Sequence, residues 1–411
     1  MRELLFLCHR IPYPPDKGDK IRAWHVLRHL AQSYAIHLGC LVDDPADFAH
    51  LPRLARECAD LAAFPINPAV QKLRALPRLL RPGEPLTLGY FHHRGLARWV
   101  ERKLARHRFA AIYVYCSAMA PYAMGAAAPC RILDMVDVDS EKWAAYAARA
   151  SFLARLVWAR EGRALLAFER AAARSFDRTL FVSEEECRRF AALAPESADR
   201  LDWAQNGVDL AHFAPDPAWP SPFAANEAAI VFTGTMDYWP NVDATLWFAR
   251  EVMPILRRRH PEARFHIVGA NPAPELRRLI GRDDVRLTGR VADTRPYLQH
   301  AALAVAPLRI ARGIQNKVLE AMAMARPVLA TPEAFAGVRA TPGRDLLLAE
   351  GVEAMAEAAA AALDGRHPGI GEAARAAMAR GHDWAATLKR LDALLGVGQA
   401  RSEPVRACVA G

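Results

Sequence analysis

The residues best suited to chemistry lie in the run R-G-I-Q-N-K-V-L-E-A-M-A, which begins at position 312. Gly313 permits a tight turn after a preceding apolar run, and a helix is predicted to begin just behind it. Asn316 and Glu320 are four residues apart, while Lys317 and Glu320 are three apart. These spacings allow all three side chains to share one face of the helix.

This arrangement suits a nucleoside diphosphate. Exposed N–H groups at the start of a helix favour a phosphate, and Lys317 adds a positive charge there. Glu320, one turn deeper, can accept hydrogen bonds from the two hydroxyls of a ribose. An ordinary surface Lys–Glu pair explains the same spacing and stays open as an alternative.

A second group of candidates follows the first apolar run of the chain, in the sequence P-P-D-K-G-D at 14–19. Gly18 would let a ligand approach the backbone closely, and Asp19 can cap the next helix. A turn and a helix cap alone would also explain these two residues. The stretch gathers three cations, which suits a phosphate-bearing ligand: Lys17, Lys20 and Arg22.

Aspartates surround the end of another apolar run, at 130–136: Asp134, Asp137 and Asp139. Taken by themselves, these positions are explained by loop or N-cap aspartates.

The elements that must position these residues alternate along the whole chain, as is typical of parallel α/β sheets. Before position 215, strands are predicted at 3–8, 35–41, 60–65, 110–115, 130–136 and 178–183, with a helix at 19–33 and one or two helices within 140–175. The proline-rich stretch 215–223 is the predicted linker. After it, strands are predicted at 228–233, 263–268, 284–287, 302–306 and 327–330, with helices at 241–258, 273–280, 293–300 and 315–325. We therefore predict domains at 1–214 and 215–382, with a helix at 383–396 that packs back on the first.

The composition indicates a globular protein: 52% of the 411 residues are hydrophobic and 24% are charged. The apolar stretches are all shorter than the ~20 residues that a membrane-spanning helix needs. Seven scattered cysteines without a C-x-x-C pair argue against a disulfide framework or a cysteine zinc site. The N-terminal apolar run is too short for a signal peptide, so we expect a cytoplasmic protein.

The net charge of +9 is concentrated in residues 72–108, which carry ten Lys or Arg against Glu84 and Glu101. Such a stretch attracts anionic lipid, nucleic acid or phosphorylated small molecules, or is simply a solvated face. Its apolar residues could enter a membrane interface: Leu73, Leu76, Leu79, Leu80, Phe91 and Trp99. We expect peripheral association with the inner face of the cytoplasmic membrane. We expect no nucleic-acid partner, because few aromatics interleave the cations.

Several runs resemble the retaining glycosyltransferases of family 4, which have the α/β GT-B fold of two Rossmann-like domains facing a central cleft. K-V-L-E-A-M-A-x-x-R-P-V-L-A resembles their donor-site signature. N-G-V-D at 206–209 with Phe213 resembles the end of their first domain, and F-T-G at 232–234 resembles the glycine loop that opens the second. H-I-V-G at 266–269 and L-T-G-R-V at 287–291 fit the next two strands.

A narrower resemblance involves three runs: C-H-R-I-P-Y-P-P-D-K-G-D, L-D-M-V-D-V-D-S-E-K-W and G-I-Q-N-K. They are similar to the sugar transferases associated with exosortase (PEP-CTERM) exopolysaccharide loci. This implies transfer of a sugar from a nucleotide-sugar donor to a glycan or polyprenyl-linked acceptor, with retention. Asp137 and Lys317 would be the catalytic residues, and the donor would be bound by Gly18, Gly234, Arg290, Arg309, Gly313, Asn316, Lys317 and Glu320.

The chain departs from the family pattern in two places. Family members usually have a second glutamate eight residues before the one that matches Glu320, and Arg312 stands there. The Arg and Lys that often follow the glycine loop are missing, so Lys317, Arg290 or Arg309 would supply the charge beside the diphosphate. With that charge and the helix N-terminus stabilising the leaving group, no metal or other cofactor is expected.

Two other functions stay open at this point. A nucleotide-sugar epimerase shares the two-domain architecture and would form product from the donor alone. A basic membrane-surface binding protein with a degenerate nucleotide site would fit the charge of residues 72–108 and the arginine at position 312.

Overall fold

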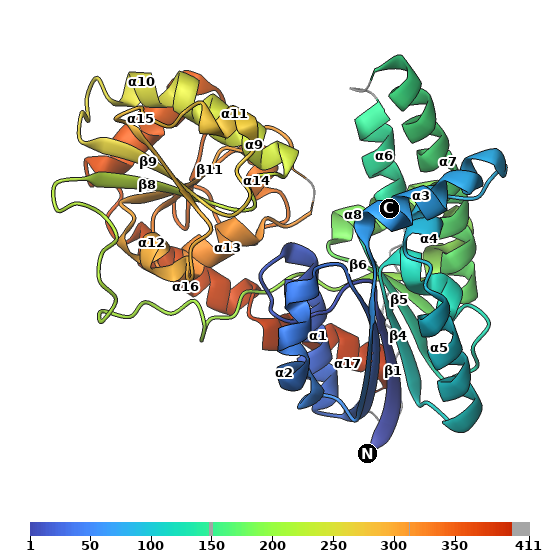
Figure 1. Cartoon of the computed structure of the whole chain (residues 1–411). Helices are drawn as coiled ribbons and strands as arrows, with labels where there is room; N and C mark the ends of the chain where they lie inside the picture. The colour runs from blue at the N-terminus through green and yellow to red at the C-terminus, as the bar shows by residue number, and fades with distance from the viewer. Residues whose placement is uncertain (148–150, 312, 397–411) are drawn as a thin grey trace. The chain divides into compact units, whose positions relative to one another are not determined.

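The computed structural model describes residues 1–147, 151–311 and 313–396. The described residues form two compact units, one of Met1–Gln205 with residues 388–396, and one of Asn206–Thr387 (Figure 1). The sequence pattern predicts boundaries after residues 214 and 382, a few residues away from these. Residues 206–213 belong to the second unit because its Arg375 donates hydrogen bonds to the carbonyls of Leu210 and Phe213, at 3.1 and 2.7 Å.

Within the described residues, the first unit contains a seven-stranded, all-parallel sheet in the order β3-β2-β1-β4-β5-β6-β7. The strands are β1 (Arg2–Cys8), β2 (Tyr34–Val42), β3 (Asp60–Pro65), β4 (Ala111–Tyr115), β5 (Arg131–Val136), β6 (Arg178–Phe181) and β7 (Leu201–Trp203). The sequence pattern predicted the first six, and β7 was missed because three residues carry little periodicity.

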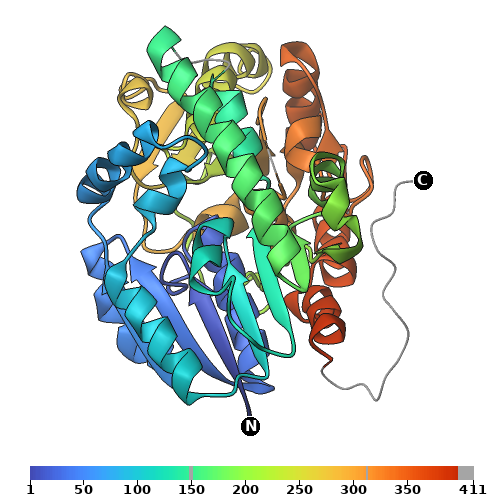
Figure 2. The same cartoon turned by 90° about the vertical axis from the view of Figure 1, so that its right-hand side faces the viewer.

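Helices cover both faces of this sheet. They are α1 (Gly18–Ala31), α2 (Leu51–Ala55), α3 (Pro68–Ala75), α4 (Leu86–Tyr90), α5 (Arg94–Arg106), α6 (Asp139–Ala147), α7 (Phe152–Ser175), α8 (Glu184–Leu193) and α17 (Trp384–Leu395). Figure 1 shows α1 and α17 on one face and α5 on the other, and Figure 2 shows α7 as the long green helix. His29 of α1 lies 2.7 Å from Asp392 of α17, which ties the C-terminal helix to the first unit.

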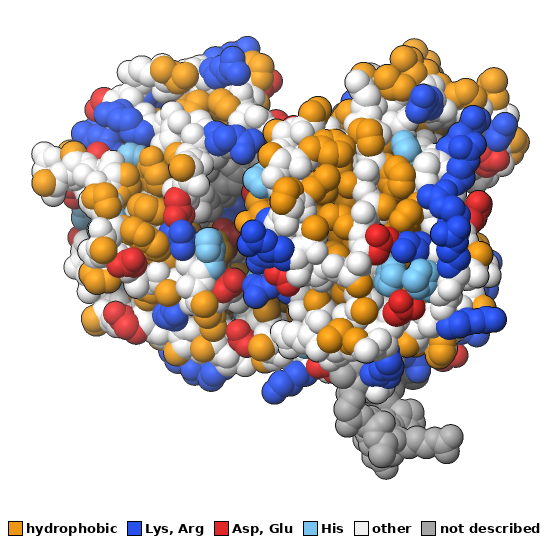
Figure 3. Space-filling model, turned by 60° about the horizontal axis from the view of Figure 1, so that its bottom comes forward, with side chains coloured by type: hydrophobic (Ala, Val, Ile, Leu, Met, Phe, Trp, Pro, Cys, Tyr) orange, Lys and Arg blue, Asp and Glu red, His pale blue; other side chains and the backbone are white. Residues whose placement is uncertain are grey.

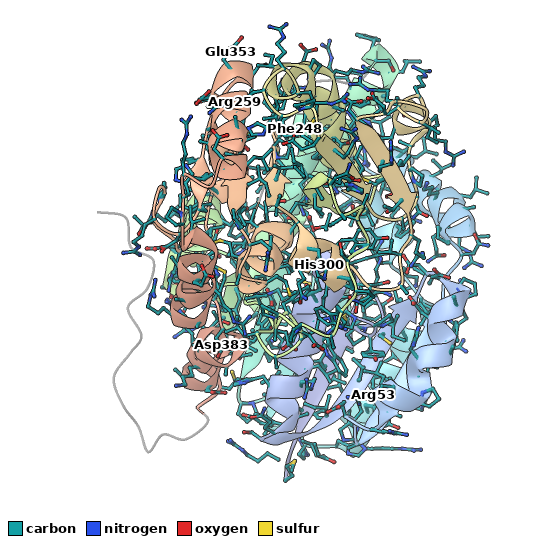
Figure 4. All side chains as sticks on the ribbon, turned by 90° about the vertical axis from the view of Figure 1, so that its left-hand side faces the viewer. Arg53, Phe248, Arg259, His300, Glu353 and Asp383 are labelled. Carbon is teal, nitrogen blue, oxygen red and sulfur yellow. The ribbon has the colours of Figure 1, made fainter. Side chains whose placement is uncertain are left out.

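The described part of the second unit has a six-stranded parallel sheet in the order β10-β9-β8-β11-β12-β13. Its strands are β8 (Ala228–Thr233), β9 (Ala263–Val268), β10 (Val285–Gly289), β11 (Leu303–Ala306), β12 (Val328–Ala330) and β13 (Leu347–Leu348). Its helices are α9 (Trp239–Trp247), α10 (Met253–Leu256), α11 (Pro274–Arg277), α12 (Arg295–His300), α13 (Asn316–Ala323), α14 (Pro332–Phe335), α15 (Val352–Leu363) and α16 (Ile370–Gly381). The core includes Phe248, whose ring centre lies 4.8 Å from that of the tilted Phe265 ring and which lies among packed side chains in Figure 4.

Both sheets reverse their strand order at one point. In the first sheet, the chain starts at the central strand β1, adds β2 and β3 on one side, and then crosses to add β4 on the other side of β1. In the second sheet, β8 is the starting strand, β9 and β10 follow on one side, and β11 lies on the other. Open parallel sheets bind ligands at the carboxyl ends of the strands beside such a switch point. Gly18 follows β1, Gly234 follows β8 and Gly313 follows β11, so these predicted residues lie in loops at ligand-binding edges.

Candidate active site

The helix α13 presents the main candidates of the second unit. Gly313 has a φ of 61°, a conformation that glycine adopts most readily, and the helix begins at Asn316. Val318 and Leu319 are fully buried in the core, which leaves Lys317 and Glu320 partly exposed. The predicted turn and helix are therefore present, whereas Arg312 lies outside the described residues.

Lys317 is held in place by groups from β8 and α9. Its Nζ donates a hydrogen bond to Asn241 Oδ1 at 2.8 Å and lies 4.9 Å from the centre of the Phe232 ring. The Asn241 amide in turn donates to the carbonyl of Thr235 at 2.8 Å, which fixes its orientation. Sequence reasoning missed Asn241, and the available signal was a polar residue in the first turn of the helix behind the glycine loop.

Gly234 lies directly beside this lysine. A Cβ at position 234 would lie 2.7 Å from Asn241 Nδ2 and 3.5 Å from Lys317 Cε, and a Cβ at Gly269 would lie 1.7 Å from the Gly234 carbonyl oxygen. The backbone contact requires glycine at position 269, whereas a side chain at position 234 would displace the amide of Asn241. The structure thus brings together Gly234 and Lys317, which are distant in sequence.

Both ionisable groups of α13 are only partly exposed, and the burial of the rest of each side chain shifts its pKa. Burial lowers the pKa of Lys317 to about 8, although the nearby Glu320 carboxylate raises it. Burial raises the pKa of Glu320 to about 7, although the Lys317 charge lowers it. Among the described residues, the buried Oδ1 of Asn316 has no hydrogen-bond partner. Perturbed charges beside an unsatisfied polar atom mark this helix face as a candidate ligand site.

The two arginines proposed for the diphosphate are placed differently. Arg309 forms an ion pair with Asp243 of α9, with Nη2–Oδ1 at 2.5 Å and Nε–Oδ2 at 3.1 Å. Arg290 is exposed and follows β10, the edge strand two positions from β8. Lys317 is therefore the cation that the structure places beside Gly234, and donor binding by Arg290 and Arg309 stays a prediction.

Asp137 belongs to the first unit, at the carboxyl end of β5. Lys142 Nζ forms ion pairs with Asp137 at 2.9 Å and with Asp139 at 2.8 Å. The residue before Asp137, Val136, has a φ of 69°, which is a strained value for a β-branched side chain. Backbone strain of this kind concentrates at functional sites and supports Asp137 as a candidate.

The prediction that the cations after β1 bind a phosphate is wrong for Lys20 and Arg22, two of the three residues concerned. Lys20 is buried, and its Nζ pairs with Asp47 at 2.7 Å. Arg22 is fully buried and donates to Asp134 Oδ2 at 2.9 Å. Both cations are therefore used inside the first unit, where each compensates a buried carboxylate.

The predicted helix cap is also wrong. Asp19 makes no capping bond to α1, because it accepts a hydrogen bond from Arg10 at 2.8 Å and lies 3.3 Å from His9. Burial raises the pKa of Asp19, but His9 and Arg10 outweigh it and hold this pKa well below its usual range. Arg10 also pairs with Asp43 at 2.8 Å. Gly18 itself is the exposed first residue of α1 and stays a candidate.

Comparison with known families identifies the second unit. Residues 227–365 match the family Glycosyl transferases group 1. This range forms a glycosyltransferase domain. It contains Gly234, Asn241, Lys317 and Glu320, so the candidate donor site around α13 lies within the range that matches the family.

Solved structures share the fold over nearly the whole chain. HepE of Anabaena in complex with UDP has a TM-score of 0.69 at 15% identity, over 96% of this chain and 99% of that one. Sucrose-phosphate synthase from Thermosynechococcus elongatus has a TM-score of 0.68 at 18% identity, over 96% and 98%. WaaG, a glycosyltransferase involved in lipopolysaccharide biosynthesis, has a TM-score of 0.64 at 16% identity, over 96% and 100%. No curated protein matches the sequence.

Two predictions are confirmed by these findings. The chain has two parallel-sheet α/β domains and the GT-B fold, and the matched domain makes it a glycosyltransferase. The assignment to retaining family 4 and the association with exosortase loci stay predictions.

Proposed function

We propose that the protein transfers a sugar from a nucleotide-sugar donor to a glycan or lipid-linked glycan acceptor. The observation that carries the proposal is Lys317, held by Asn241 beside Gly234 at the switch point of a glycosyltransferase domain. The helix N-terminus and Lys317 present positive charge suited to the diphosphate, and Glu320 can accept hydrogen bonds from ribose. UDP-sugars are the first donors to test, because HepE of Anabaena binds UDP and UDP-glucose.

The finer parts of the proposal rest on the family resemblance. Members of the family that the sequence resembles transfer sugar with retention of the anomeric configuration, and Asp137 corresponds to a residue near the reacting sugar. Lys142, paired with Asp137, would orient this carboxylate. A role in exopolysaccharide synthesis follows from the narrower resemblance to exosortase-associated transferases. The reaction needs no metal if Lys317 and the helix N-terminus stabilise the departing diphosphate.

A donor screen tests the proposal directly. The purified protein is melted with UDP-, GDP- and dTDP-sugars, and a donor at 100 times its Kd should add about 2.7 kcal/mol of stability. The selected donor is then incubated with and without a glycan acceptor, and the anomeric proton of the product is identified by NMR. Product formed from the donor alone would indicate an epimerase. Absence of stabilisation by every nucleotide-sugar would contradict the proposed donor site.

The proposal includes docking of the first unit on an anionic membrane surface. On α3 and the turn behind it, Leu73 and Leu80 expose 66% and 88% of their surface among the cations of residues 72–108. Phe152 at the start of α7 exposes 66%, and Arg160 of the same helix donates to the carbonyl of Arg78 at 2.7 Å. These elements therefore form one surface that combines apolar side chains with positive charge, as interfacial anchors do.

The arginines of α5 extend the positive charge. They follow one another at four-residue spacing, which aligns them along one face of the helix: Arg94, Arg98, Arg102 and Arg106. Figure 3 shows a row of Lys and Arg side chains beside hydrophobic ones on one face of the molecule. Trp99, expected to enter the interface, is only 7% exposed because it packs on β2. In the described parts of the chain, every helix is too short or too polar to cross a bilayer.

Vesicle co-sedimentation tests the docking surface. Each cation near anionic lipid contributes roughly 1 kcal/mol, so we expect binding to anionic vesicles that is lost at high salt. The double substitution Leu73→Ser and Leu80→Ser should weaken binding, whereas Ile280→Ser, which removes an equally exposed side chain of the second unit, should not. Equal partitioning of the wild type on anionic and neutral vesicles would refute electrostatic docking.

A further inference from the structure

A group of potential metal ligands lies in the first unit, at the amino ends of its strands and away from the ligand-binding edge. Glu3 is in β1, His37 is in β2, and His107 follows α5. One ligand atom from each of these residues lies within 4.8 Å of the other two. Among the described residues, this is the one group of three or more His, Cys, Asp or Glu side chains whose ligand atoms come this close together.

The sheet register places two of these ligands on the same face. His37 pairs with Leu5, which is two residues beyond Glu3 on β1, so the Glu3 and His37 side chains point the same way. The third ligand, His107, is brought close by a backbone hydrogen bond. The N–H of Ala110, three residues after His107, donates to the Glu3 carbonyl at 2.8 Å. The convergence is therefore fixed by backbone pairing and not by flexible side chains alone.

The distances fit a shared cation. Glu3 Oε1 lies 3.3 Å from His37 Nε2 and 3.1 Å from His107 Nδ1. Zinc binds histidine nitrogen and carboxylate oxygen at about 2.0–2.2 Å, so neighbouring ligand atoms of a tetrahedral site lie about 3.3 Å apart. The 3.3 Å separation is longer than the usual 2.7–3.2 Å of an N–H···O hydrogen bond.

The surroundings suit a bound ion with one open position. The His37 side chain is 6% exposed, whereas those of His107 and Glu3 are 27% and 35% exposed, which gives an ion a path from solvent. Lys103, whose charge disfavours a positive charge at His37, is itself compensated by Asp60, with Nζ–Oδ2 at 2.8 Å.

We propose that Glu3, His37 and His107 form a binding site for a divalent transition-metal ion, with Zn²⁺ as the expected ion and water as its fourth ligand. Two imidazoles and one carboxylate are ligands that Zn²⁺ accepts, and the site uses none of the cysteines. Because the ligands come from β1, β2 and the segment before β4, a bound ion would link two neighbouring strands to the segment that leads into a third. Its role is therefore structural and independent of the proposed glycosyl transfer.

Zinc titration of the full chain, without an affinity tag and after chelator treatment, tests the site. Calorimetry should give one site per chain, and the melting temperature should rise with zinc. Glu3→Gln and His107→Gln, both at partly exposed positions, should each raise the Kd about tenfold or more. His212→Gln, which changes an exposed histidine of the second unit, should leave the Kd unchanged.

A second metal distinguishes this site from binding by thiols. The absorption spectrum of the Co²⁺-loaded protein should show bands of nitrogen and oxygen ligands without thiolate charge transfer. Circular dichroism of each variant checks that it is folded. Lack of saturable zinc binding, unchanged affinity in both variants, or a thiolate band would overturn the proposal.

Discussion

Binding of a nucleoside diphosphate should release protons near neutral pH and take up protons in mildly alkaline solution. With a pKa of about 8, the buried Lys317 is partly deprotonated in mildly alkaline solution. A diphosphate beside its Nζ would favour the charged form and raise this pKa, so binding takes up a proton. Glu320 has a pKa of about 7, and ribose hydroxyls that donate to its carboxylate would lower it, so binding releases a proton near neutrality.

The magnitudes follow from these two values. At pH 8.5, about a quarter of Lys317 is protonated without ligand, so complete protonation takes up about 0.8 proton. Glu320 is already ionised there and contributes almost nothing. At pH 7, Glu320 is about half protonated and releases about 0.5 proton, while Lys317 takes up only about 0.1. The net coupling should therefore change from about 0.4 proton released to about 0.8 taken up.

Calorimetric titration of UDP in buffers of different ionisation enthalpy measures this coupling at each pH. Lys317→Met should abolish the uptake at pH 8.5, and Arg278→Met, which changes an exposed arginine of the same unit, should not. Comparison of variant and wild type cancels any protons that UDP itself exchanges. If both proteins take up the same number of protons at pH 8.5, the reasoning about Lys317 is wrong.

Three further predictions concern the donor site and the stability of the first unit. Glu320→Gln should weaken nucleotide binding, whereas Lys317→Ala should mainly lower kcat, by about 2–4 kcal/mol in the transition state; unchanged kcat/KM in both would contradict the site. Arg22→Met leaves the buried Asp134 carboxylate without its cation and should lower the free energy of unfolding in urea by about 3–5 kcal/mol, and a loss below 1 kcal/mol would argue against this pairing. Burial and the nearby Asp139 raise the pKa of Glu169 to about 8, so the folded state holds a proton that the unfolded state loses near its ordinary pKa. Stability should fall by up to about 1.4 kcal/mol per pH unit between pH 5 and 8, and Glu169→Gln should remove that slope in urea unfolding measured across this range; parallel pH profiles would contradict it.

The sequence alone determined the order of strands and helices and the main helix of the donor site. Hydrophobic periodicity is a local property, so the strands of both sheets and the start of α13 near Gln315 could be predicted from short windows. The shared helix face of Lys317 and Glu320 follows from spacing in the same way. The short strands β7 and β13 were missed because they carry too few positions for a pattern.

The tertiary structure alone decided which charged residues are available for a ligand. The sequence pattern indicated that Arg22 could bind a phosphate. In the structure, Arg22 is buried inside the unit and its charge is paired with Asp134, which lies 112 residues away in the sequence. Arg309 is likewise paired with Asp243, 66 residues away, while Asn241 positions Lys317 across 76 residues. The energy of an ion pair depends on the distance between the two charges and on how deeply they are buried. Both are set by packing between elements that are far apart in sequence, so a pattern within a short window does not predict them.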